Sequence, residues 1–106
     1  MNYLQRIRYS EWIDGSGWRL TDAYAGIDDI ILSDDEIDDN FANGDFAELI
    51  TEGYCDDDLR AMADADGSDY KYEYTLTDED GNLVKRIELW MSDAARYRLG
   101  DEEVTL

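Results

Sequence analysis

The chain has 106 residues, of which 28 are acidic and 9 are basic, so its formal net charge is −19. It contains no histidine and one cysteine, Cys55. These counts exclude an imidazole base, a Ser–His or Cys–His nucleophile pair, an intramolecular disulfide and a Cys-rich zinc site. The length predicts one domain, residues 1–106, and a hydrophobic content of 43% is enough for a core.

Membrane association is not expected from this sequence. No apolar run approaches the roughly 18 residues needed to cross a bilayer, and residues 1–6 lack the layout of a signal peptide. The negative charge also repels nucleic acid and acidic membrane surfaces. We therefore expect a cytoplasmic protein with no direct nucleic-acid or membrane partner.

The first third of the chain predicts a hairpin followed by an ambiguous segment. Residues 3–13 alternate as a strand, residues 14–17 (Asp-Gly-Ser-Gly) form a turn signal, and residues 18–20 read as a short return strand. Residues 21–31 fit either a short helix after Thr21 or a buried strand over 27–32. We favour helix or irregular structure there.

Three short acidic helices are predicted next. Ser33 and Glu36 have capping-box spacing, which predicts a helix as far as Phe41, broken at Asn43-Gly44. Residues 45–52 predict a second helix and Asp56-Asp57-Asp58 open a third. The side chains expected to be buried in the second and third helices are Phe46, Leu49, Ile50, Leu59, Met62 and Ala63.

The last third predicts a second hairpin and a short helix. Residues 70–77 and 83–91 alternate on either side of a turn over 78–82. Ser92-Asp93 is expected to cap a helix through Arg98, with residues 101–106 as a tail or edge strand. The predicted fold is α+β: an antiparallel sheet from two hairpins, with short acidic helices packed on one face.

The net charge lies in the middle of the chain. Residues 22–80 hold 21 acidic side chains and only two basic ones, Arg60 and Lys71, so this segment carries −19. The remaining residues hold seven of each sign and sum to zero. Because such a charge opposes folding by self-repulsion and attracts cations, we expect this acidic central segment to bind a basic partner.

Acidic rows on the predicted helices are the candidate binding site. Side chains three or four residues apart on a helix lie about 5–6 Å apart, a spacing similar to that of DNA phosphates. The alternative is an ordinary solvated acidic face. The candidate partner-binding residues are Asp34, Asp35, Asp38, Asp39, Asp45, Glu48, Glu52, Asp56, Asp57 and Asp58.

In size, charge and helical carboxylates, residues 22–80 resemble the DNA-mimic inhibitors of phages and mobile elements, which include anti-CRISPR and anti-restriction proteins. Those proteins share no common fold, so no functional residue carries over from them. The resemblance implies inhibition of a nuclease or other nucleic-acid-binding complex, such as a CRISPR effector or restriction enzyme. It also implies a location in the host cytoplasm if the chain is phage-encoded. Two alternatives stay open: an immunity-type or adaptor protein that binds its partner elsewhere, and adaptation to high salt.

Metal binding and catalysis find no support in the sequence. The acidic loops 64–69 and 78–82 lack the glycine and glutamate that an EF-hand needs at positions 6 and 12. Paired carboxylates are expected by chance among 28 acidic residues. We predict no metal, no cofactor and no enzyme activity.

Aromatic residues allow two interpretations. The stripe of Tyr70, Tyr72 and Tyr74 fits either an interface or the core, and core is favoured. The three tryptophans, Trp12, Trp18 and Trp90, are expected in the core. Cys55, beside three aspartates, is expected to be unreactive.

Overall fold

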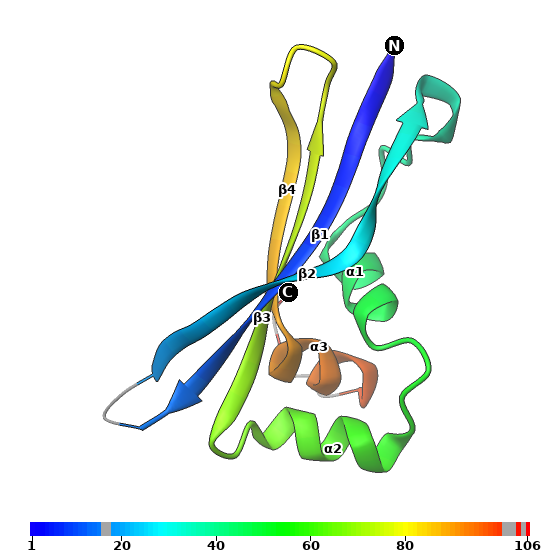
Figure 1. Cartoon of the computed structure of the whole chain (residues 1–106). Helices are drawn as coiled ribbons and strands as arrows, with labels where there is room; N and C mark the ends of the chain where they lie inside the picture. Colours follow the sequence, from blue (N-terminus) through cyan, green and yellow to red (C-terminus); the bar gives the residue numbers. More distant parts are fainter. Residues whose placement is uncertain (16–17, 101–103, 105) are drawn as a thin grey trace.

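The structure is a computed structural model that describes residues 1–15, 18–100, 104 and 106, with the side chains of residues 18–28 left undescribed. Its sheet has four antiparallel strands in the order β2-β1-β3-β4. The strands are β1 (Asn2–Asp14), β2 (Trp18–Ser33), β3 (Ser68–Thr77) and β4 (Leu83–Trp90). Two hairpins, β1–β2 and β3–β4, therefore form one sheet, as predicted (Figure 1).

The central pair of strands, β1 and β3, joins the two hairpins. They are in register from Leu4 opposite Thr77 to Ile13 opposite Ser68. Alternation along both strands places Ile7 beside Tyr74, and Ile87 of β4 continues this row. Because alternate residues share a face, one side of the sheet becomes apolar and the other polar.

The prediction of helix or irregular structure for residues 21–31 is wrong. This segment belongs to β2, which pairs with β1 as far as Ser33 opposite Asn2. Ile27 lies opposite Ile7 and Ile31 opposite Leu4. The long β1 strand supplies backbone partners along the whole segment, and this non-local pairing outweighs the weak local helix signal. The turn predicted at residues 14–17 extends beyond the described residues.

The helix predicted from Ser33 to Phe41 is also wrong beyond its first turn. The capping box forms, since the Ser33 amide and hydroxyl donate to Glu36 Oε1 at 3.1 and 3.0 Å, but only the 3₁₀ helix η1 (Asp34–Glu36) follows. The Asp38 carboxylate then accepts the Asn40 amide at 2.9 Å, a local turn that competes with helix. The predicted break at Asn43-Gly44 is instead the start of α1.

The described residues form three α-helices, namely α1 (Asn43–Ile50) and α2 (Asp56–Asp64) between β2 and β3, and α3 (Met91–Arg98) after β4. They confirm the second, third and last predicted helices. Ser92 does not cap α3 as expected, because its hydroxyl donates to Asp69 instead. Gly100, with φ of 82°, follows the end of α3. The predicted tail or edge strand falls largely outside the described residues.

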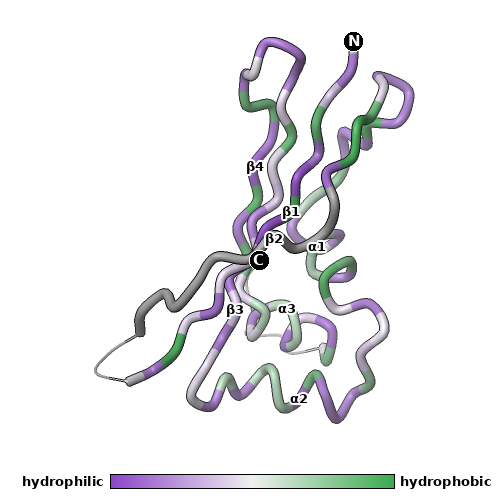
Figure 2. The backbone as a smooth tube through the Cα atoms, in the orientation of Figure 1, coloured by the Kyte–Doolittle hydropathy of each residue, from purple (hydrophilic) through white to green (hydrophobic). Residues whose placement is uncertain are grey.

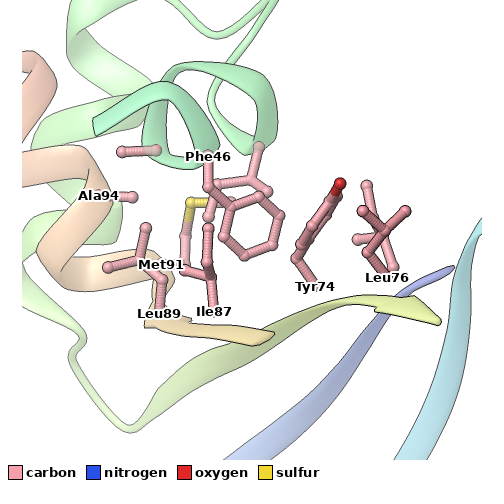
Figure 3. Packing of buried hydrophobic residues seen from close by; sticks show 10 residues of the cluster. Phe46, Tyr74, Leu76, Ile87, Leu89, Met91 and Ala94 are labelled. Atoms are coloured by element: carbon pink, nitrogen blue, oxygen red, sulfur yellow. The ribbon is translucent and has the colours of Figure 1, made fainter. Parts of the chain in front are cut away.

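The helices cover one face of the sheet, and the core lies between them (Figures 1 and 3). Phe46 is fully buried and contacts Tyr74, with ring centroids 5.8 Å apart. Leu49 was expected to be buried, but it is 36% exposed, and Ala47 takes the inward position. The other buried members of this core are Ile7, Ile50, Leu76, Ile87, Leu89, Met91 and Ala94.

The opposite face of the sheet is not covered by the helices, and we call it the open face. Figure 2 shows hydrophilic and hydrophobic residues in succession along β1 and β4, as expected for strands whose two faces differ. Trp12 and Trp90 pack edge to face on the open face, with ring centroids 5.7 Å apart. They were expected in the core, but they are not part of the helix-covered core. The described side chains on this face include Leu4, Arg6, Arg8, Ser10, Trp12, Asp29, Ile31, Lys71, Glu73, Thr75, Leu83, Arg86, Glu88 and Trp90.

Candidate interface for a basic partner

The acidic layer, which we define as residues 34–66, lies on the helix side of the molecule. It contains η1, α1, α2 and their connecting loops, with 13 acidic residues and one basic residue, for a net charge of −12. All ten candidate binding residues fall in this layer and all are exposed. They form three groups, which lie around α1, near the N-terminus and on α2.

The first group surrounds an open hollow beside α1. Four carboxylates line it: Asp45 and Glu48 are on α1, Asp38 precedes this helix and Glu52 follows it. Apolar surface from Phe41 and Leu49 forms part of the same lining. The residues of this α1 hollow are Asp38, Phe41, Asp45, Glu48, Leu49, Glu52, Gly53 and Arg98.

Local hydrogen bonds orient two of these carboxylates. Asp45 accepts the Ala42 amide at 2.9 Å, which satisfies an amide at the start of α1, and Asp38 accepts the Asn40 amide at 2.9 Å. Glu48 lies 4.0 Å from the Arg98 guanidinium, while Glu52 carries no such restraint among the contacts of the described residues. The hollow therefore combines carboxylates held by local contacts with the apolar surface of Phe41 and Leu49.

The second group lies near the N-terminus, and its predicted rows do not exist. Because the helix ends at Glu36, the pairs Asp34 with Asp38 and Asp35 with Asp39 do not stack on a helical face. Asp34 instead lies 3.2 Å from the Met1 ammonium. Lys85 donates to the backbone carbonyl of Phe41 at 2.8 Å, which ties this loop to β4.

Three acidic residues that were interpreted only as a turn join this second group. Asp78, Glu79 and Asp80 connect β3 to β4 at the same end of the sheet as η1 (Figure 1). The Asn2 amide donates to Glu79 Oε1 at 2.7 Å. Burial of Tyr3, together with a hydrogen bond to Asp34 and the charges of Asp34, Asp78 and Asp39, raises the pKa of the Tyr3 hydroxyl. Only the register of β1 with β3 could have revealed this cluster.

The third group is the Asp56-Asp57-Asp58 run in the first turn of α2, where negative charge suits the helix dipole. Asp57 lies 3.2 Å from Arg60 of the same helix. Helix α3 contacts both α1 and α2, and its C-terminal half carries Arg96 and Arg98. The acidic side chains of α1 and α2 are thus separated by a basic strip, so they do not form one continuous row.

In each of the two acidic loops, one carboxylate accepts hydrogen bonds from the protein itself. Asp69 accepts the Ser92 amide at 3.1 Å and the Ser92 hydroxyl, while Asp78 accepts the amides of Asp80 and Asn82. The amide of Asn82 and its neighbours lower the pKa of the Asp78 carboxyl. Within the described residues, no group of three or more His, Cys, Asp or Glu side chains is placed to hold a metal ion.

The tyrosine stripe divides between core and surface. Tyr74 is buried in the core, as favoured, whereas Tyr70 is exposed and Tyr72 is half-buried. Tyr9 stacks on Tyr72, with ring centroids 5.2 Å apart. Burial, followed by the nearby hydroxyls of Tyr54, Tyr9 and Tyr70, raises the pKa of Tyr72 to about 12. Cys55 is exposed directly before α2.

Comparisons of the chain with protein-family models, with curated proteins and with solved structures find no match. Among the described residues, no helix has both the length and the apolar content required to cross a membrane.

Proposed function

We propose that this chain binds a basic protein through its acidic layer and inhibits a nucleic-acid-binding enzyme by occupying the surface that contacts phosphates. The observation that carries this proposal is the separation of charge between the two sides of the molecule. The acidic layer has a net charge of −12, whereas the described charged residues of the open face nearly balance, with four cations and five carboxylates. A one-signed surface of this kind steers a basic partner towards one side of the molecule.

The α1 hollow is the part of the acidic layer best suited to a specific contact. Asp45 and Glu48 are three residues apart on α1, so their side chains lie about 5–6 Å from each other. Phe41 and Leu49 add apolar surface between the carboxylates. Lysine and arginine side chains have both a cationic head and an aliphatic stem, and this hollow offers a partner for each part.

Two other functions compete with inhibition by DNA mimicry. An immunity-type or adaptor protein would bind the same basic partner while leaving its nucleic-acid site free. Adaptation to high salt would require acidic residues over the whole surface, and the paired cations and carboxylates of the open face argue against it. Competition with DNA distinguishes the immunity-type or adaptor function from mimicry, because only a mimic would compete with DNA for the partner.

The experiment is affinity capture from a host lysate at low salt with two matched charge-reversal variants. Glu48→Lys changes the α1 hollow, and Asp14→Lys makes the same change in net charge outside the acidic layer. Both side chains are exposed, so both variants are expected to fold. We expect the first variant to lose the captured basic protein and the second to retain it.

Equal retention by both folded variants would remove the α1 hollow from the interface. Equal loss from both would mean that net charge alone, without a site, determines binding. Far-UV circular dichroism of each variant provides the folding control.

A further inference from the structure

The open face carries a charge pattern unlike the rest of the molecule. In the middle of this face the described cations are Arg6, Arg8, Lys71 and Arg86, and the described carboxylates are Asp29, Glu73 and Glu88. Asp14 and Asp69 add two carboxylates at the Trp12 end. Most of them are paired across neighbouring strands: Arg6 lies 2.8 Å from Asp29, Arg86 lies 2.8 Å from Glu73, and Lys71 lies 3.4 Å from Glu88. Arg86 also contacts Glu88. This face is therefore a balanced mosaic on a chain of net charge −19.

Arg8 is the exception within this mosaic. It is exposed at the centre of β1, opposite Glu73 of β3, and it forms no ion pair with a described residue. A shallow hollow beside it is lined by Ser10, Trp12, Lys71 and Glu88. Arg8 and Lys71 line this hollow together with Glu73 and Glu88, so a second surface with the same mixture of charges can fit against it.

Apolar side chains lie at both ends of the open face. At the N-terminal end, Ile31 lies opposite Leu4, and Thr77 of β3 separates Leu4 from Leu83. Ile31 is 61% exposed and Leu83 is 57% exposed. At the other end, Trp12 and Trp90 pack against each other. Figure 2 shows the hydrophobic residues near the end of β2 and the start of β4. Apolar contact is thus available on either side of the charged centre.

We propose that the open face binds a second copy of this chain, forming a two-fold dimer with the acidic layers on its outside. Everywhere on the acidic layer two copies repel each other, whereas on the open face positive and negative side chains of one copy can oppose their counterparts in the other. A two-fold arrangement needs such a self-complementary surface, because the same patch serves both copies. This inference concerns a different surface from the proposed function and does not depend on it.

The size of the open face is sufficient for such a dimer. Four strands at a spacing of about 4.8 Å, over the ten residues of β3 at about 3.4 Å each, give a flat area of about 650 Å² per copy. Side-chain relief adds to this value. Specific interfaces bury about 800 Å² per partner, with weaker ones below that size.

The test is the molar mass of the full chain in solution, measured by sedimentation equilibrium at low and high salt. We expect a mass approaching twice the monomer value of 12.2 kDa, with more dimer at high salt. Salt screens the long-range repulsion between two chains of charge −19 more strongly than it screens contacts inside the interface. Binding of a basic partner through the acidic layer should instead weaken at high salt. Failure of one proposal can therefore be distinguished from failure of the other.

Two matched variants locate the interface. Arg8→Glu and Arg60→Glu change the net charge equally, but Arg8 is on the open face and Arg60 is on α2. We expect Arg8→Glu to weaken dimerisation about tenfold or more, because it places a third carboxylate beside Glu73 and Glu88, and Arg60→Glu to leave it nearly unchanged. Ile31→Glu, at an exposed position, is a second variant that should also weaken the dimer.

A wild-type chain that stays monomeric at millimolar concentration and high salt would overturn the proposal. So would a dimer that Arg8→Glu and Ile31→Glu leave intact, or one that Arg8→Glu and Arg60→Glu weaken equally. Circular dichroism confirms that each variant is folded before its mass is interpreted.

Discussion

Asp69 shows how one side chain can connect two distant elements. It lies at the start of β3, is 8% exposed, and accepts both the amide and the hydroxyl of Ser92 in the first turn of α3. The start of a helix has unsatisfied amides and a partial positive charge, so a carboxylate there is doubly favourable. The sequence pattern assigned this capping role to Ser92 and could not identify Asp69, because the two residues are 23 positions apart.

Removing this carboxylate should therefore destabilise the fold. We expect Asp69→Ala to lower the free energy of unfolding by about 1–3 kcal/mol, because the Ser92 donors lose their buried acceptor. Asp66→Ala removes an exposed carboxylate nearby and should change stability by less than about 0.5 kcal/mol. Urea unfolding followed by tryptophan fluorescence measures both, and equal effects would contradict the assigned role of Asp69.

Tyr72 predicts how stability responds to alkaline pH. Its pKa is about 12 in the folded chain against an ordinary value of 10.0, so folding favours the neutral hydroxyl. The stabilisation is complete below pH 10 and is lost as the pH rises towards 12, because the unfolded chain ionises first. A two-unit difference corresponds to about 2.7 kcal/mol at most. Urea unfolding between pH 9 and 12 should show a smaller loss for Tyr72→Phe than for the wild type, and identical losses would refute this assignment.

At the scale of elements, local sequence patterns correctly predicted the helices and strands that depend mainly on local interactions. The alternation of β3 and β4 and the apolar spacing of α1 and α2 predicted these elements correctly. The length of β2 was missed, because it depends on pairing with β1 from Asn2 onwards. The helix after Ser33 was overextended, because the capping box specifies how a helix starts and the Asp38 turn ends it after Glu36.

Helix α1 is held to the sheet chiefly by Phe46. Its ring is fully buried against Tyr74 and lies 6.3 Å from Phe41, centroid to centroid. We expect Phe46→Ala to cost about 3–5 kcal/mol, the range for removing a buried aromatic ring. Leu49→Ala, on the same helix but at an exposed position, is the matched control and should cost much less. Thermal or urea unfolding compares the two, and similar costs would argue against this packing of α1.

At the scale of the whole molecule, the central finding is that charge is separated between two sides. Counting residues predicted that the middle of the chain carries the net charge, and the structure puts its residues 34–66 on the helix side of the sheet. Counting could not predict the grouping of the acidic residues. Asp38 meets Asp45 and Glu48 in the α1 hollow, whereas α3 separates them from the acidic turn of α2. That grouping depends on how helices pack, which no local pattern contains.

The open face illustrates the same point from the opposite side. Arg6, Arg86 and Lys71 are far apart in sequence. Arg6 and Arg86 belong to the two ends of the chain, which together have no net charge, and Lys71 belongs to the acidic central segment. Strand pairing brings them onto one surface with Glu73 and Glu88. The composition of this surface therefore depends on the register between strands that are distant in sequence, which local sequence patterns do not predict.

The most direct test of the central claim is competition between DNA and this chain for one captured basic protein. The immobilised chain is loaded with that protein at low salt, and a duplex oligonucleotide is then titrated while the retained protein is measured. If the acidic layer occupies a phosphate-binding surface, DNA should release the captured protein in proportion to its own affinity. Retention of the protein together with bound DNA, as a ternary complex, would contradict DNA mimicry and favour binding outside the nucleic-acid site.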